Sequence, residues 1–247
     1  MVIEPTWMFP MADVMYAFRE STIAGKSIVL LLFAGSIIAW SIMITKYIEL
    51  KRSSSSSDRF LGMYERESHP VALYLKRPSV PNSPLFHVYQ AGCGAVASEL
   101  TASDERPGEL HLGSLKESSI RLSAVQIDGV TNLGERVVNG ELLKLERHMM
   151  MLATAVSAAP FLGLLGTVWG VMDGFSGMAK EGAATLSAVA PGISAALLTT
   201  VVALLVALPS SIGYNLLLER IRILTVLIEN FSQEFSTSLR RYYGPLS

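Results

Sequence analysis

The stretch from Gly182 to Leu218 contains no Asp, Glu, Lys or Arg over 37 residues. A second uncharged run, from Met149 to Met172, precedes it, and the short connection between the two runs carries Lys180 and Glu181. An α-helix rises about 1.5 Å per residue, so about 20 apolar residues cross the ~30 Å hydrocarbon core of a bilayer. Because the connection is short, we expect the two runs to form an antiparallel helical hairpin inside a membrane.

A third apolar run, residues 27–45, lies between Lys26 and Lys46 and predicts a further membrane span. Only 17% of the residues are charged, against about 25% in soluble domains. No alternating strand pattern of useful length occurs anywhere in the chain. The expected fold is therefore an all-α membrane protein with three transmembrane helices and long cytoplasmic helical extensions.

Charge placement predicts the orientation. Of the 20 Lys and Arg residues, 13 lie in residues 46–147 and four follow the last span. By the positive-inside rule the large loop and the tail are cytoplasmic, and the N-terminus is periplasmic. We expect an N-terminal periplasmic or interfacial segment (residues 1–26), a first span (27–45) and a cytoplasmic loop or helical domain (46–148). A second span (149–178), a third span (185–209) and a cytoplasmic C-terminal helix (210–247) follow.

Helical patterns continue outside the spans. In the tail, apolar residues three or four apart form one stripe and predict a helix that packs on the helix before the second span. That preceding helix is predicted to run unbroken into the second span, with Glu141, Lys144 and Arg147 at its polar positions. Ser53–Ser57 is interpreted as a solvated, flexible stretch, and the prolines of residues 78–84 as a linker. The residues of the stripe are Leu217, Ile221, Leu224, Ile228, Phe231, Phe235 and Leu239.

Small residues recur along both helices of the hairpin. In a bilayer, small residues on one face let helix backbones approach closely, so they predict a tightly packed helix pair. Pro160 and Pro191 lie inside apolar sequence, where a proline kinks a helix and serves packing or gating. The small residues are Gly163, Gly166, Gly170 and Gly174 on the second span, and Ala196, Thr200, Ala203, Ala207 and Ser211 on the third.

Four polar residues of the hairpin are candidates for a water or proton path: Thr167, Thr199, Thr200 and Asp173. A threonine hydroxyl can also return to the carbonyl four residues earlier, so each threonine has a purely structural alternative. An ionisable residue at membrane depth is a functional candidate, but Asp173 lies near the outer boundary, where water reaches it.

Other classes of site find little support. Cys93 is the only cysteine, and it is interpreted as a small helix-packing residue. No Ser-His-Asp, Cys-His or metal-ligand arrangement is recognisable, and His69, His87, His111 and His148 are scattered. The net charge of −1 gives no reason to expect a nucleic-acid partner. We therefore predict neither an enzyme nor a metal or organic cofactor.

The hairpin sequence resembles the TolQ/ExbB/MotA proton-channel family. The resemblance rests on GLLGTVWG at residues 163–170, ATL at 184–186, VAPGIS at 189–194 and ALLTT at 196–200, followed by a proline and then tyrosine-asparagine. It covers residues 141–243 closely, and the first span and loop match only in plan. Three spans with an outside N-terminus are similar to the TolQ/ExbB branch rather than to the four-span flagellar stators.

This resemblance implies a pentameric ring around a central pore in the bacterial inner membrane. Two copies of a single-span TolR/ExbD-like partner are expected inside the ring, with a TolA/TonB-like protein as a further partner. Protons are then the coupling ion, and the proton motive force energises an outer-membrane process, either Tol-Pal envelope integrity or TonB-type import. The pore threonines of the family correspond to Thr167 and Thr200.

One position departs from the family pattern. Many relatives carry a glutamate where this chain has Ala195, and Asp173 is a hypothetical substitute because both sites should lie toward the outer ends of their helices. The missing acid favours the alternative of a non-conducting membrane scaffold of the same fold. A secondary transporter fits less well, because three spans offer no pair of half-helices with a charged centre.

Overall fold

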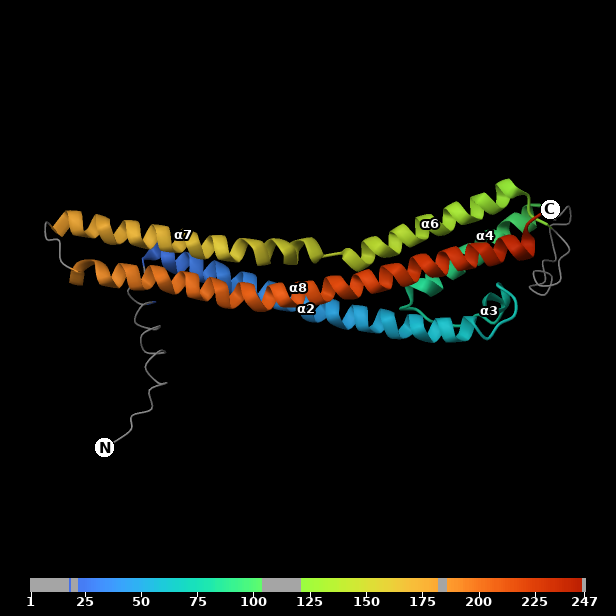
Figure 1. Cartoon of the computed structure of the whole chain (residues 1–247), viewed down its shortest axis with the longest axis horizontal. Coiled ribbons are helices and arrows are strands. Elements are labelled where there is room, and N and C mark those ends of the chain that lie inside the picture. Colours follow the sequence, from blue (N-terminus) through green and yellow to red (C-terminus); the bar gives the residue numbers. More distant parts are fainter. Residues whose placement is uncertain (1–17, 19–21, 104–120, 182–185, 246–247) are drawn as a thin grey trace, which may run out of the picture. The chain divides into compact units, whose positions relative to one another are not determined.

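The computed structural model describes Phe18 and residues 22–103, 121–181 and 186–245, and within these ranges every element is a helix (Figure 1). The predicted N-terminal interfacial segment lies almost wholly outside the described residues, and so do residues 182–185. The predicted all-helical fold is confirmed. The helices are α2 (Ile23–Tyr64), α3 (Ala72–Leu75), α4 (Pro84–Ser103), α6 (Ala124–Glu146), α7 (Met149–Glu181) and α8 (Leu186–Tyr243).

Three helical stretches of the described chain are long and apolar enough to cross a membrane: Ile23–Tyr64, Ala124–Ala179 and Val189–Tyr243. The first is α2, the second comprises α6 and most of α7, and the third is nearly all of α8. A span needs about 20 residues, so α2 with 42 residues and α8 with 58 residues extend well beyond one. The predicted helical continuation of the tail after the third span is confirmed.

The chain divides into two compact units. Unit 1 comprises Met1–Thr45 and His148–Leu216, and unit 2 comprises Lys46–Arg147 and Leu217–Ser247. Unit 1 therefore contains the three apolar runs of the sequence, and unit 2 contains most of the charged residues.

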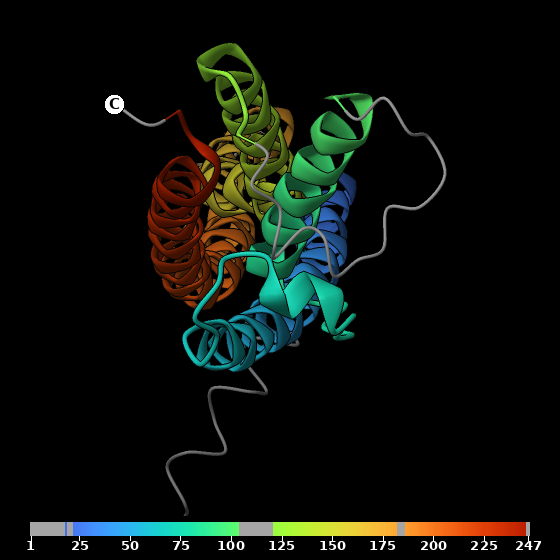
Figure 2. The same cartoon turned by 90° about the vertical axis from the view of Figure 1, so that its right-hand side faces the viewer.

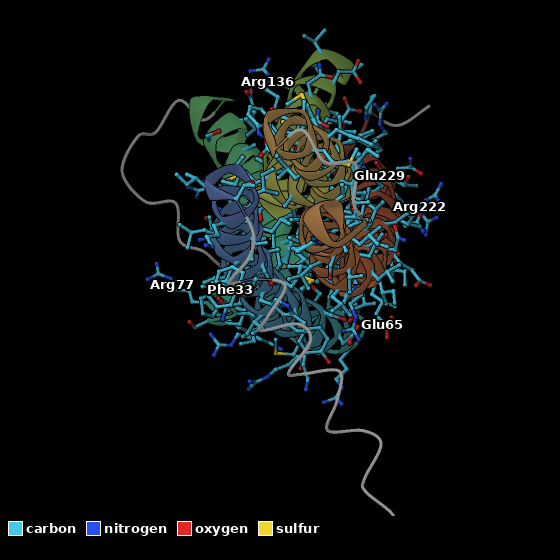
Figure 3. The ribbon with its side chains drawn as sticks, turned by 90° about the vertical axis from the view of Figure 1, so that its left-hand side faces the viewer. Phe33, Glu65, Arg77, Arg136, Arg222 and Glu229 are labelled. Carbon is cyan, nitrogen blue, oxygen red and sulfur yellow. The ribbon has the colours of Figure 1, made fainter. Side chains whose placement is uncertain are left out.

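Three alanines and two larger aliphatic side chains form the centre of unit 1. Ile28 and Leu32 of α2 pack with Ala159 of α7 and with Ala203 and Ala207 of α8. Many other large apolar side chains point outward; Phe33, for example, is 64% exposed on the outside of α2 (Figure 3). An apolar exterior around a core rich in small residues is the arrangement expected where lipid rather than water surrounds the helices.

Aromatic rings form the centre of unit 2, where α2, α4 and α8 meet (Figure 2). Phe60 of α2 is fully buried, and its ring centroid lies 5.4 Å from those of Tyr89 on α4 and Phe231 on α8. All seven residues of the apolar stripe predicted for the tail are buried, so that prediction is confirmed.

The tail packs on α6 as predicted. Arg240 of α8 forms an ion pair with Asp128 of α6, with a nitrogen–oxygen distance of 2.7 Å. Ser123 begins α6 with a capping box, in which its hydroxyl accepts the amide of Gln126 and the Gln126 side chain accepts the amide of Ser123. The Arg121 guanidinium donates to the carbonyls of Tyr242 and Gly244, where it complements the negative end of α8.

Burial also explains the chemistry of Cys93. Its thiol is buried in unit 2 beside Tyr89, and burial raises the pKa of the Cys93 thiol far above its ordinary value. Desolvation likewise raises the pKa of Tyr64 to about 12. The thiol therefore stays protonated, which agrees with its interpretation as a packing residue.

The predicted unbroken helix from unit 2 into the second span is wrong. Helix α6 ends at Glu146, and α7 begins at Met149. Between them Arg147 is extended, with ψ 135°, and His148 has φ 69°, in the left-handed region. No glycine or proline marks this break, although histidine is enriched among the non-glycine residues that adopt this conformation.

The interpretation of Ser53–Ser57 as a flexible stretch is also wrong. These residues form part of α2, and Ser53 and Ser57 are buried. The Ser57 hydroxyl lies 3.3 Å from that of Ser83, which in turn accepts the amide of Phe86 at the start of α4. Small hydroxyl side chains thus let α2 pack closely on α4. The proline linker is confirmed, since α4 starts at Pro84.

We expect truncation of Phe60 to destabilise unit 2. Phe60→Ala leaves a cavity among four aromatic rings, and such a change costs about 3–5 kcal/mol of unfolding free energy. Denaturant unfolding of the full chain in detergent measures it. Val125→Ala, at a side chain that is 81% exposed, is the control and should change stability by less than about 0.5 kcal/mol. Equal effects of the two variants would contradict the assignment of this core.

Candidate functional site

The four glycines predicted to pack the hairpin lie against α8. A Cβ added at Gly163 would lie 2.5 Å from the Ala203 Cβ, and one at Gly170 would lie 2.7 Å from the Ala196 Cβ. Real Cβ contacts of this length do not occur, so only glycine permits this spacing of the helices. The fit is tight rather than exclusive at Gly174, where an added Cβ would lie 3.3 Å from a Val189 methyl carbon, and at Gly192 of α8, where it would lie 3.3 Å from the Gly174 Cα.

This close approach brings two threonines of α8 to the backbone of α7. The Thr200 hydroxyl donates to the Gly163 carbonyl over 3.0 Å. In a regular α-helix the same carbonyl also accepts the amide of Thr167, one turn further along α7. The candidate residues Thr167 and Thr200 therefore lie at neighbouring levels of the hairpin, and each side chain is half-buried.

Thr199 and Thr167 differ in their environment. Thr199 is 1% exposed, packs on Gly166 and donates to the Ala196 carbonyl over 2.7 Å. Its hydroxyl is thus used inside the hairpin. Thr167 donates to the Leu164 carbonyl over 2.7 Å, a local bond that can exchange for water or a partner group without breaking a contact between helices.

Asp173 is half-buried on α7, next to Gly174. Its carboxyl group forms no hydrogen bond or ion pair with any residue that the structure describes, and residues 182–185 of the adjoining turn are outside that range. A carboxyl group in this position has its binding capacity free for water, a proton or another chain.

Ala195, where the family pattern has a glutamate, is only 4% exposed in unit 1. Its neighbour Ala196 contacts Gly170, and Gly192 contacts Gly174, so Ala195 and Asp173 lie at similar levels of the hairpin. The two positions are thus close along the helix pair, as the hypothesis of substitution by Asp173 requires.

The two prolines are inside helices. Pro160 lies in α7 and Pro191 in α8, and α8 also contains Pro209. Each removes one backbone donor from its helix. Pro160 follows Ala159, which packs in the core of unit 1.

A second group of polar residues was missed from the sequence. Lys46 is 3% exposed, and its ammonium group donates to the Glu49 carboxylate and to the Lys144 carbonyl. Glu141 is 6% exposed and accepts from Lys144 and contacts His87, although the sequence placed it on the polar side of its helix. Both charged side chains are buried, whereas charged residues usually face water. Hydrophobic periodicity in the sequence gives no sign of such an exception.

Unit 2 also contains a polar groove of about 550 Å³ between α6 and α8. Glu135 of α6 and Glu229 of α8 lie along it, together with serine, threonine, asparagine and glutamine side chains. Among the residues that the structure describes, no three His, Cys, Asp or Glu side chains are arranged to hold a metal ion.

Comparison with known proteins finds one matching family model and several relatives that this chain resembles over most of its length. Residues 111–230 match the model of the MotA/TolQ/ExbB proton channel family. The Tol-Pal system protein TolQ of Pseudomonas aeruginosa is 30% identical over 90% of both chains, and TolQ of Haemophilus influenzae is 28% identical over 91% of this chain and 92% of its own. The biopolymer transport protein ExbB of Pseudomonas putida is 30% identical over 80% of this chain and 54% of its own.

Side chains added to the glycine face should separate α7 from α8. A Cβ at Gly166 would lie 2.3 Å from the Thr199 hydroxyl oxygen and 2.7 Å from its Cβ, and the short threonine side chain has no room to withdraw. We expect Gly166→Val to cost about 1–3 kcal/mol, seen as a lower melting temperature of the purified protein. Gly177→Val, on the same helix with open space around it, is the matched control. A Gly166→Val protein as stable as wild type would rule out this packing.

Proposed function

The chain belongs to the MotA/TolQ/ExbB proton channel family and is an inner-membrane protein, and from this premise we propose that it is the proton-channel subunit of an envelope motor. In this proposal the proton motive force drives the motor, and a single-span TolR/ExbD-like partner passes the work to an outer-membrane process. In this proposal that process is Tol-Pal envelope integrity or TonB-type import; the relatives are named a Tol-Pal system protein and a biopolymer transport protein, and these names support it.

The arrangement of Thr167 and Thr200 is the observation that carries the proposal. The hydroxyl groups of two half-buried threonines lie at neighbouring levels of a largely apolar hairpin, and among the described residues each donates to a backbone carbonyl. Hydroxyl groups donate and accept, so they can pass hydrogen bonds along a row of water molecules or hold the carboxyl group of a partner. We assign this role to both residues.

Thr199 has a supporting role in this scheme. Its hydroxyl is bonded to the Ala196 carbonyl and lies 3.4 Å from that of Gly163, so it holds α8 at the height at which Thr200 reaches α7. The glycines 163, 166, 170 and 174 keep the two helices at this separation. The proposed proton path thus depends on the close packing of α7 and α8.

The proposed assembly is a pentamer around a central pore with two copies of the partner inside it. An aspartate in the partner's span would take up and release protons, so the chain itself needs no covalent chemistry and no cofactor. Each elementary charge that crosses gains about 2.3 kcal/mol per 100 mV of membrane potential. The motor would act on a TolA/TonB-like protein through the partner.

The orientation is part of the proposal. Positive charge is concentrated in residues 46–147 and in the tail, which together make up most of unit 2. With unit 2 in the cytoplasm and the N-terminus in the periplasm, the chain obeys the positive-inside rule. Asp173 then lies toward the periplasmic end of α7, where its carboxyl group, which has no partner among the described residues, can collect protons in place of the glutamate that Ala195 replaces.

A non-conducting scaffold of the same fold is the second candidate, and the buried methyl group of Ala195 favours it. If the acid at that position is indispensable for conduction, this chain would assemble the ring and its partners without passing protons. Proton flux separates the two candidates, because a scaffold gives none with or without Thr167 and Thr200.

Replacing either threonine by valine should lower proton flux through the reconstituted complex. Valine keeps the shape and removes the hydroxyl, so Thr167→Val and Thr200→Val should each reduce flux about tenfold, equivalent to about 1.4 kcal/mol, or roughly one hydrogen bond. Flux is measured with a pH-sensitive dye in proteoliposomes. Thr154→Val is the control, since Thr154 forms a similar bond to the Met150 carbonyl on the exposed side of α7. Unchanged flux in both variants would exclude these residues from the path.

Asp173→Asn should reduce coupled activity in cells about tenfold, because asparagine cannot bind or release a proton. Resistance to detergent of cells that depend on this gene for envelope integrity, or growth on a large imported nutrient, reports that activity. Asp173→Glu keeps the carboxyl group and should retain most of it. Full activity of Asp173→Asn would show that no acid at this level of the hairpin is needed.

A further inference from the structure

A buried carboxylate in unit 2 holds two cationic or titratable side chains. Glu141 of α6 is 8% exposed at its side chain, and its Oε1 lies 2.7 Å from the Lys144 Nζ and 3.2 Å from the His87 Nδ1. His87 belongs to the first turn of α4. A carboxylate this far from water is stable as an ion only when donors surround it, and these two side chains are the donors present.

The second ring nitrogen of His87 also faces an acceptor. Its Nε2 lies 3.1 Å from the carbonyl oxygen of Pro81, in the linker before α4. A neutral imidazole has one N–H group, so it satisfies either the carbonyl or the carboxylate, and its other nitrogen turns a lone pair toward an oxygen. The imidazolium has two N–H groups and satisfies both.

We propose that His87 and Glu141 form a proton-binding site in unit 2, separate from the threonines of the hairpin, and that the geometry is that of its protonated form. The bound proton lets His87 join three segments: the linker at Pro81, the start of α4 and the last turns of α6. When the proton leaves, one of the two contacts is lost, and α6 is held less firmly on α4.

The neighbouring charges act in both directions. The Glu141 carboxylate stabilises the imidazolium, whereas the Lys144 ammonium and the positive end of α4 oppose it. From α2, the Lys46 ammonium reaches the Lys144 carbonyl over 3.0 Å and pairs with Glu49. The end of α6 is therefore held from two sides, by Lys46 of α2 and by His87 of α4, and of these two contacts the one from α4 depends on the bound proton.

The His87–Glu141 site lies next to the break between α6 and α7, so binding of the proton can affect that break. Glu141 and Lys144 occupy the last two turns of α6, immediately before the break at Arg147–His148 and the first residue of α7. A change in how these turns are held alters the freedom of the segment that joins the two units along the chain. This inference does not rest on the proposed function, because it holds for a conducting subunit and for a scaffold.

Hydrogen exchange of the full-length protein tests the proposal. Wild type and His87→Gln are compared by mass spectrometry at about pH 5.5 and about pH 8.5, on either side of the ordinary histidine value. At the lower pH we expect the amides of residues 85–90 and 141–146 to exchange about tenfold faster in the variant. At the higher pH the two proteins should exchange alike. The neutral imidazole of wild type then satisfies only one of its two acceptors, so wild type loses its advantage over the glutamine variant. Comparing variants at one pH cancels the intrinsic pH dependence of exchange.

Glu141→Gln should reproduce the effect at low pH, since the imidazolium then loses its anionic partner. Glu146→Gln, which changes an exposed carboxyl group on the same helix, should leave exchange unchanged. His87 is about one-third exposed, so its replacement by glutamine leaves the core intact. An effect of His87→Gln that is equal at both pH values, or absent at both, would overturn the proposal.

Discussion

In unit 1 the backbones of α7 and α8 approach closely enough for the Gly163 carbonyl to accept the Thr200 hydroxyl. Lipid offers no hydrophobic force between helices, so such a pair is stabilised by van der Waals contact and by hydrogen bonds across a face of small residues. Larger residues would remove the contact and the bond together. The placement of Thr200 against α7 follows from this one constraint, and so do the similar levels of Asp173 and Ala195 along the helix pair.

The three spans and the packed hairpin were largely predictable, because membrane spans and faces of small residues produce clear patterns in a sequence. A run of 37 uncharged residues has few alternatives to a membrane helix, and glycines four apart have few alternatives to a packed face. The stripe from Leu217 to Leu239 was equally clear, and all of its residues are buried. Which threonine points into the hairpin could not be predicted, because Thr199 and Thr200 are adjacent and differ only by the rotation of the helix.

The failures lie where a local pattern competes with tertiary packing. Ser53 and Ser57 are buried in α2 because small hydroxyl groups suit a close crossing with α4, whereas a serine run alone indicates a solvated segment. The left-handed His148 interrupts a pattern that is helical on both sides. Glu141 looked like a solvated position until α4 placed His87 beside it. For Ser57 and Glu141 a partner distant in the sequence decides the outcome.

The most direct measurement is native mass spectrometry of the detergent-purified complex, expressed together with its chromosomal neighbours. A channel subunit of the proposed kind should appear as five chains of 26.8 kDa with two copies of a smaller single-span protein. A monomer, or a closed ring that never takes up a partner, would contradict the motor and favour the scaffold.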